Sequence, residues 1–155
     1  MQDRSTTPFS PVPPTTTPTT LVAPRNGHVV VLGMMAAGKT TVGSRLAQRL
    51  GRRFLDSDLM IHQAQGATVR ELERRDGLPR VHELEWEALR EALEAPRPVV
   101  VAAAASVVDH PEAATLLAGR GLVAWLRITP ETMLHRMEAD PDERQRPTLG
   151  AAGPR

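Results

Sequence analysis

Residues 33–40 read Gly33-Met34-Met35-Ala36-Ala37-Gly38-Lys39-Thr40 and fit the pattern GxxxxGK followed by Ser or Thr. A continuously apolar run at 28–32 precedes them, which is typical of a parallel strand buried on both faces. A helical pattern follows at 40–50. In such a junction, glycines let backbone N–H groups point at phosphate, and the helix N-terminus adds its positive dipole. The stretch therefore predicts a nucleotide-binding loop, in which Lys39 reaches the phosphates and Thr40 supplies a hydroxyl to Mg²⁺.

Lys39 is the one lysine among 19 basic residues, and it falls at the phosphate-binding position of the motif, where the planar guanidinium of an arginine would be a poor substitute.

The 155 residues allow one domain, and the absence of cysteine excludes a disulfide scaffold and a cysteine nucleophile. A net charge of +1 provides no overall positive electrostatic field that would attract nucleic acid. No apolar run reaches the roughly 18 residues of a membrane helix. The N-terminus has no charged start followed by an apolar core, so we expect no secretory signal and a cytoplasmic protein.

Residues 1–26 are rich in threonine and proline, and we interpret them as a disordered tail. The alternative is a ligand for a proline-recognition domain. From residue 27 to residue 155 we expect one α/β domain, with a parallel sheet of four strands covered by helices on both faces. Strands are predicted at 28–32, 53–55, 99–103 and 122–126, and helices at 40–50, 59–65, 82–95, 111–118 and from 129 onward, with one more helix capped by Thr68 and Glu71.

Two acids, Asp56 and Asp58, follow the second predicted strand. The carboxyl ends of parallel strands form the ligand crevice of such sheets. There Asp56 could hold Mg²⁺ through water, and Asp58 could accept a proton or a hydrogen bond from an acceptor hydroxyl. The alternative is a helix N-cap with an acidic first turn, which is a common structural feature.

The segments that carry these features stand in the same order as in a known family: the loop at 33–40, Phe-Leu-Asp-Ser-Asp at 54–58, Gly-Ala-Thr-Val-Arg-Glu-Leu at 66–72, Asp-Gly at 76–77 with His-Glu-Leu-Glu at 82–85, the fourth strand at 121–126, and Arg-Pro-Thr-Leu at 146–149. From residue 28 to residue 150 the chain resembles the shikimate kinases, small P-loop kinases of the nucleoside monophosphate kinase type. The resemblance implies a three-layer P-loop kinase fold and phosphoryl transfer from MgATP to the 3-hydroxyl of shikimate, a precursor of aromatic amino acids.

The resemblance also implies roles for individual residues and the cofactors ATP and Mg²⁺. The implied catalytic residues are Lys39, Asp58 and Arg146. Thr40 and Asp56 are the implied Mg²⁺ residues. We expect a small-molecule substrate, no nucleic-acid or membrane partner and, by default, a monomer. The residues implied to bind ATP are Gly33, Ala36, Ala37, Gly38, Lys39, Thr40, Thr41 and Arg146, and those implied to bind the acceptor are Asp58, His82, Ala104 and Ala105.

The chain departs from the family pattern at the acceptor side. His82 stands where the family has an arginine for the substrate carboxylate, so a fixed bidentate cation becomes a group that is largely neutral at pH 7. Alanines within 103–106 replace three glycines, which would make any positive φ costly there, while Ser106 could restore one hydrogen-bond donor. The chain stops at Arg155, inside the family's lid region, so we expect the family's fifth strand and last helix to be missing.

Two smaller expectations concern other residues. Ala36 stands where the family usually has glycine, and we expect it to keep a negative φ. Trp86 and Trp125 are expected to pack in the core rather than stack on a base. The alternative function is a nucleotide-binding relative with a degraded or changed acceptor site, either an inactive homologue or a kinase for another small hydroxylated acceptor.

Overall fold

A computed structural model describes residues 27–139. The predictions for the tail at 1–26 and for Arg146 lie outside these residues. The described part is α/β, with the strands and helices in the following order: β1 (His28–Gly33), α1 (Lys39–Leu50), β2 (Arg53–Asp56), α2 (Ser57–Gln65), α3 (Val69–Asp76), α4 (Leu78–Leu93), β3 (Val99–Ala104), the 3₁₀ helix η1 (Ala105–Asp109), α5 (Ala113–Arg120), β4 (Gly121–Leu126) and α6 (Pro130–Ala139).

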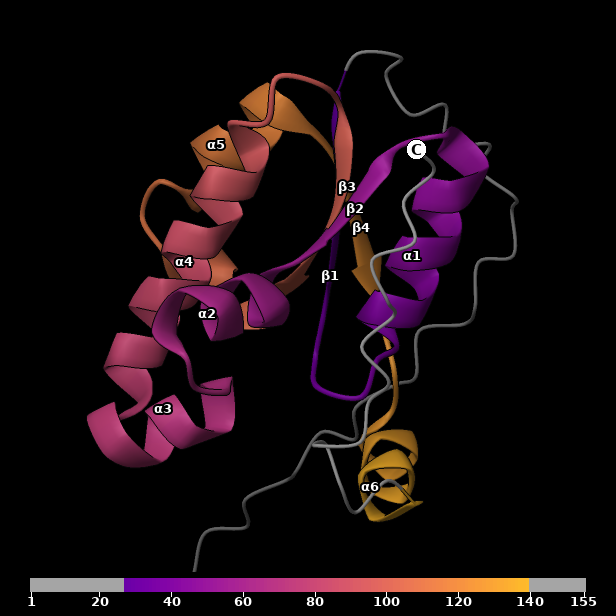
Figure 1. Cartoon of the computed structure of the whole chain (residues 1–155). Coiled ribbons are helices and arrows are strands. Elements are labelled where there is room, and N and C mark those ends of the chain that lie inside the picture. Colours follow the sequence, from indigo (N-terminus) through magenta and orange to yellow (C-terminus); the bar gives the residue numbers. More distant parts are fainter. Residues whose placement is uncertain (1–26, 140–155) are drawn as a thin grey trace, which may run out of the picture.

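The four strands form one parallel sheet, as the sequence predicts (Figure 1). Their order across the sheet is β2-β3-β1-β4. The central strand β1 pairs with β3 on one side and β4 on the other, so that Val29 lies opposite both Val100 and Leu122. Because β1 is paired on both edges and covered on both faces, its continuous run of valines is fully buried.

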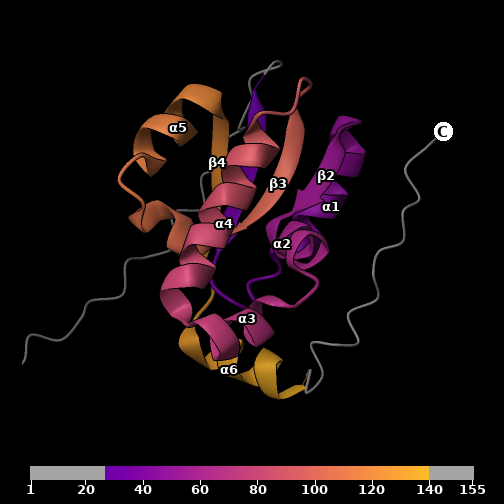
Figure 2. The same ribbon diagram turned by 60° about the vertical axis from the view of Figure 1, so that its left-hand side comes forward.

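Alternate residues of β1 serve two different hydrophobic clusters. Val30 and Leu32 pack with α4 and α5 on one face, where the cluster includes Trp86, Leu89 and Leu117. Val29 and Val31 pack on the other face against Ala47 of α1. The two helical layers on either side of the sheet are visible in Figure 1 and, turned, in Figure 2. The three-layer prediction is confirmed.

The helix α1 packs through small residues rather than through its most apolar face. The spacing of Val42, Leu46 and Leu50 gives the helix an apolar face, but Val42 and Leu50 are 42% and 39% exposed. The buried residues of α1 are Gly43 and Ala47. A Cβ on Gly43 would stand 2.6 Å from Cε2 of Phe54, so the close packing of α1 on β2 depends on this glycine.

Helix ends follow the local sequence. Thr68 and Glu71 form the predicted capping box at the start of α3, and both of its hydrogen bonds are present. The long helix predicted at 82–95 begins earlier, at Leu78, because Gly77 ends α3 and Pro79 stands in the first turn of α4.

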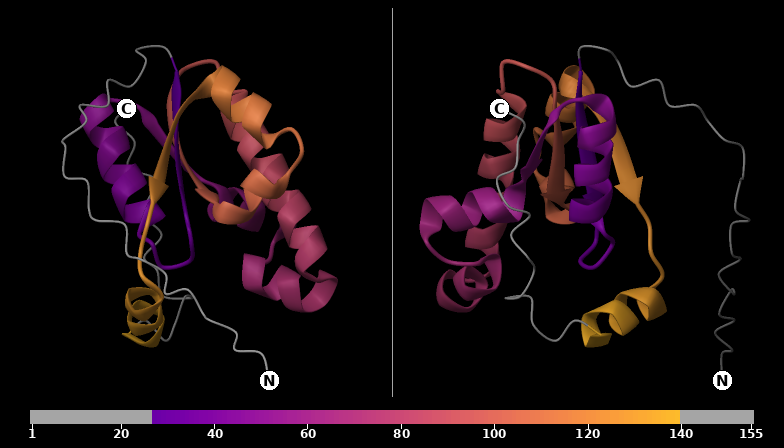
Figure 3. Two further views of the ribbon diagram at one scale, coloured as in Figure 1. Left: turned by 180° about the vertical axis from the view of Figure 1, so that it is seen from behind. Right: turned by 45° about the vertical axis from the view of Figure 1, so that its right-hand side comes forward.

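The chain passes from β4 into α6, which lies beyond the carboxyl ends of the strands (Figure 3). Within residues 27–139, no helix is long and apolar enough to cross a membrane.

Candidate functional site

The loop between β1 and α1 forms a tight turn. The amide of Ala37 donates to the carbonyl of Met34 at 3.2 Å, and Ala36, the third residue of this turn, has φ 58°. A turn with positive φ at its third residue ordinarily takes glycine there. The prediction that Ala36 keeps a negative φ is therefore wrong: the turn imposes a left-handed conformation that costs an alanine about 1–2 kcal/mol.

The two glycines of the loop act in different ways. Gly38 caps α1 with φ 87°, a conformation that side chains rarely adopt. Gly33 has no such φ, but a Cβ there would stand 2.8 Å from the carbonyl oxygen of Leu126 on β4. The close approach of β4 thus requires a glycine at the end of β1, while the conformation of the helix cap requires one at the start of α1.

Lys39 folds back over the loop. Its Nζ donates to the carbonyl oxygens of Gly33 at 3.0 Å and of Met34 at 3.2 Å. The ammonium therefore lies at the mouth of the loop, at the N-terminus of α1, where a bound anion would also meet the helix dipole. Ala37 is buried within the loop, whereas Thr41 is exposed on the first turn of α1.

Thr40 and Asp56 meet across the sheet edge. The Thr40 hydroxyl donates to Oδ2 of Asp56 at 2.7 Å, which links the start of α1 to the end of β2. The other carboxylate oxygen of Asp56 accepts the amide of Asp58 at 3.1 Å and caps α2. Both interpretations of this acid pair thus find support, since Asp56 is a helix N-cap and also stands beside the hydroxyl predicted to bind Mg²⁺. A hydroxyl and a carboxylate are hard oxygen donors, and this donor set fits Mg²⁺.

The segment that follows β3 places alanines at the same edge of the sheet. Ala104 ends β3 and Ala105 begins η1, and both are partly buried. No alanine of this run has a positive φ, since Ala36 is the one non-glycine residue with positive φ among residues 27–139. The backbone strain that the sequence led us to consider is therefore absent. What the alanines add is methyl groups.

The side chain of Ser106 is hydrogen-bonded to α4. Its hydroxyl donates to Oε2 of Glu85, a carboxylate on α4 that is 7% exposed. The Ser106 hydroxyl, which we expected could restore a donor at this site, is thus already hydrogen-bonded to a buried carboxylate. His82 lies one turn before Glu85 on α4 and is exposed. This part of α4 therefore carries an exposed imidazole and a buried carboxylate that is bonded to Ser106.

The two tryptophans differ. Trp86 is buried and stacks on His110, with ring centroids 3.9 Å apart. Its predicted packing role is confirmed. Trp125 on β4 is 46% exposed, so the same prediction is wrong for it. Its strand is an edge strand of the described sheet, and its side chain lacks a covering layer among residues 27–139.

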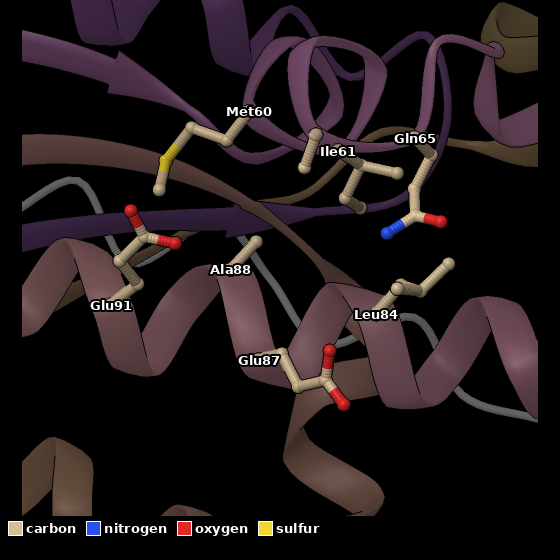
Figure 4. A pocket seen from close by; sticks show the side chains of 8 residues that line it. Met60, Ile61, Gln65, Leu84, Glu87, Ala88 and Glu91 are labelled. Atoms are coloured by element: carbon tan, nitrogen blue, oxygen red, sulfur yellow. The ribbon is translucent and has the colours of Figure 1, made fainter.

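A hollow between α2 and α4 lies apart from the loop (Figure 4). Met60 and Ile61 of α2 face Leu84 and Ala88 of α4 across it, and the carboxylates of Glu87 and Glu91 stand at its rim. Apolar walls with acidic groups disfavour a phosphate ligand. This hollow is therefore not a candidate for the predicted phosphate site.

Two residues of the site region were missed by sequence reasoning. Arg136 of α6 donates from Nη1 to the carbonyl oxygen of Ala36 at 2.9 Å, across 100 residues of sequence. No local pattern could have indicated that contact. The burial of Glu85 had a signal, because a glutamate stands on the apolar side of α4 between Leu84 and Ala88.

A parallel sheet in the order β2-β3-β1-β4, with a GxxxxGKT loop after its central strand, defines a small protein with the P-loop kinase fold. A family model described as "Shikimate kinase" matches residues 35–155. The chain belongs to the shikimate kinase family.

Individual relatives agree with this assignment. The chain is 41% identical over 110 residues to the shikimate kinase of Synechococcus sp. (strain CC9605), a match that covers 71% of this chain and 54% of the relative. For the shikimate kinase of Moorella thermoacetica, the identity is 36% over 129 residues, covering 83% of this chain and 72% of the relative. The solved structure of shikimate kinase from Acinetobacter baumannii in complex with shikimate superposes with a TM-score of 0.68 at 32% identity, covering 82% of this chain and 69% of that chain. The matches thus span between 54% and 72% of the length of these relatives.

Proposed function

We propose that this protein is an ATP-dependent phosphotransferase that transfers the γ-phosphoryl group of MgATP to the 3-hydroxyl of shikimate. The single observation that carries the proposal is the arrangement of side chains on the phosphate-donor side of the site. Lys39 lies at the mouth of the loop, and the Thr40 hydroxyl lies 2.7 Å from Oδ2 of Asp56. The family membership and a relative solved with shikimate support the choice of acceptor.

We expect phosphate binding to change the contacts of Lys39. When phosphate enters the loop, Lys39 exchanges its two carbonyl acceptors for phosphate oxygens, and its charge offsets the charge that builds up during transfer. Mg²⁺ keeps several waters when it binds to proteins, so Thr40 would be its direct protein ligand and Asp56 would hold it through water. The metal supplies neutralisation of the phosphate oxygens.

On the acceptor side, we propose that Asp58 binds the acceptor hydroxyls and takes the proton released on transfer. Asp58 is exposed in the first turn of α2, next to the cap formed by Asp56. His82, Ala104 and Ala105 would border the acceptor. Arg146, outside the described residues, is proposed to neutralise charge on the transferring group.

A second candidate is a nucleotide-binding relative whose acceptor site has changed. Two observations favour it. His82 stands where the family pattern has an arginine, so the bidentate guanidinium for the carboxylate of shikimate is missing. Ser106 is bonded to Glu85, whose own negative charge repels an anionic substrate. Under this reading ATP binds, but shikimate does not stimulate turnover, and another small hydroxylated acceptor takes its place.

The test measures ADP release from MgATP with and without shikimate, alongside ATP binding by calorimetry. The kinase proposal expects shikimate-dependent ADP that is lost in Lys39→Met. The matched control is Arg49→Met, a change of a basic residue exposed on the same helix, which should leave turnover intact. ATP binding without shikimate-dependent ADP selects the second candidate. Full ATP affinity in Lys39→Met would refute the loop as the nucleotide site.

A further inference from the structure

The helix α6 reaches the phosphate-binding loop through one side chain. None of its residues is buried, and Arg136 extends from it to the loop. The guanidinium donates from Nη1 to the Ala36 carbonyl oxygen at 2.9 Å. The same nitrogen lies 4.0 Å from the position that a Cβ on Gly38 would take. The guanidinium therefore lies over the tight turn and beside the cap of α1.

This contact falls on the strained residue of the loop. The carbonyl of Ala36 and the amide of Ala37 belong to one planar peptide unit. The carbonyl end of that unit accepts from Arg136, and its amide end donates to the Met34 carbonyl at 3.2 Å. Both ends of the plane are thus fixed, which sets the torsion ψ on the carbonyl side of Ala36. Together with the φ of 58° on its amide side, this torsion defines the left-handed conformation of Ala36.

We propose that Arg136 is a positioning residue that holds Ala36 in its left-handed conformation and so keeps the loop shaped for phosphate. An alanine does not adopt this conformation readily, whereas a glycine would adopt it without help. The proposal rests on the proposed function only for the statement that phosphate is the ligand. It also couples α6 to the loop, because a movement of α6 releases the Ala36 carbonyl and lets the turn relax.

The test is a double-mutant cycle that combines Arg136→Met with Ala36→Gly. Affinity is measured for inorganic tripolyphosphate and for MgADP, since tripolyphosphate carries no nucleoside. We expect Arg136→Met alone to weaken both affinities about tenfold, and to weaken them less than about twofold in the Ala36→Gly background. His135→Met, at the neighbouring exposed position of α6, is the matched control and should change neither affinity.

Other outcomes overturn the proposal. An equal loss in both backgrounds would mean that Arg136 acts on the phosphate by its charge, and a loss for MgADP alone would mean that it contacts the nucleoside. Amide hydrogen exchange at Ala37 gives a readout that needs no ligand. Protection of that amide should fall in Arg136→Met and return in the double variant, and unchanged protection would refute the coupling. If the unmodified protein binds neither ligand, the nucleotide site fails, while the exchange measurement still decides the role of Arg136.

Discussion

The carboxylate of Asp56 has an observed structural role, as hydrogen-bond acceptor and helix cap, and a proposed role in holding Mg²⁺, and a pair of substitutions distinguishes the two. In Asp56→Ala both roles are lost. The charge-assisted hydrogen bond from Thr40 at 2.7 Å contributes about 1.5 kcal/mol at this partly buried position, and the cap on α2 contributes about 1 kcal/mol. A loss of about 2.5 kcal/mol in a domain of this size lowers the melting temperature by about 10 °C.

In Asp56→Asn the amide oxygen still caps α2, and the amide nitrogen can donate to the Thr40 hydroxyl. We therefore expect the melting temperature to fall by less than about 4 °C. The negative charge is gone, however, so the Mg²⁺-dependent part of the ATP affinity should drop about 10- to 100-fold. Calorimetric titration of ATP with Mg²⁺ and with EDTA measures that part directly. An asparagine variant that keeps the full Mg²⁺ effect would refute the metal role, and an alanine variant that melts unchanged would refute the structural one.

Burial and the nearby charges of two arginines lower the pKa of His28 below its ordinary value of 6.5. Its neutral ring accepts a hydrogen bond from the amide of Val99. Neutral His28 therefore stabilises the fold above about pH 6.5, and this stabilisation is lost as the pH falls. Thermal melting at pH 7.5 and 5.5 should show a smaller drop for His28→Asn than for the unmodified protein; equal drops would contradict this account. Thr68→Ala removes the capping box and should lower the melting temperature by about 4 °C. Hydrogen bonds from Thr68 hold the pKa of Glu71 low, so this loss should shrink as the pH falls below about 4.5, and a constant loss would argue against the box. His82→Arg should lower the KM for shikimate in the ADP-release assay, because it supplies a bidentate cation for the carboxylate; no gain would indicate that the methyl groups of the alanine run limit the acceptor site.

The loop and the sheet could be predicted because their signals are local. A continuous apolar run marks β1, and the spacing of glycines, Lys39 and Thr40 marks the loop. The meeting of Thr40 and Asp56 also follows, since parallel strands bring their carboxyl ends to one edge. The sequence did not predict why Gly33 and Gly38 are each required in the loop. Gly33 is required by the carbonyl of Leu126, and nothing near Gly33 in the sequence reveals that neighbour.

The errors have a common physical origin in long-range geometry. The φ of Ala36 depends on the hydrogen bond that closes its turn, not on the residue type. The apolar spacing of α1 indicates an amphipathic helix, but whether a second layer covers Val42 depends on other elements. Trp125 shows the same limit on an edge strand. Arg136 and Ala36 are brought together only by the completed fold.

The position of β1 in the sheet has a consequence for how the chain reaches its native state. The strand that precedes the loop, β1, is the first in the sequence, but both of its partner strands come much later. Val29 of β1 pairs with Val100 in β3 and with Leu122 in β4. High contact order of this kind slows folding, because long chain closures precede any gain from pairing. During synthesis, the loop after β1 emerges early, but β1 has both of its partner strands only after β4 has been made. On the proposed function, nucleotide binding should report the pairing of β1 with both β3 and β4, and nucleotide added during refolding should stabilise that late step rather than the first.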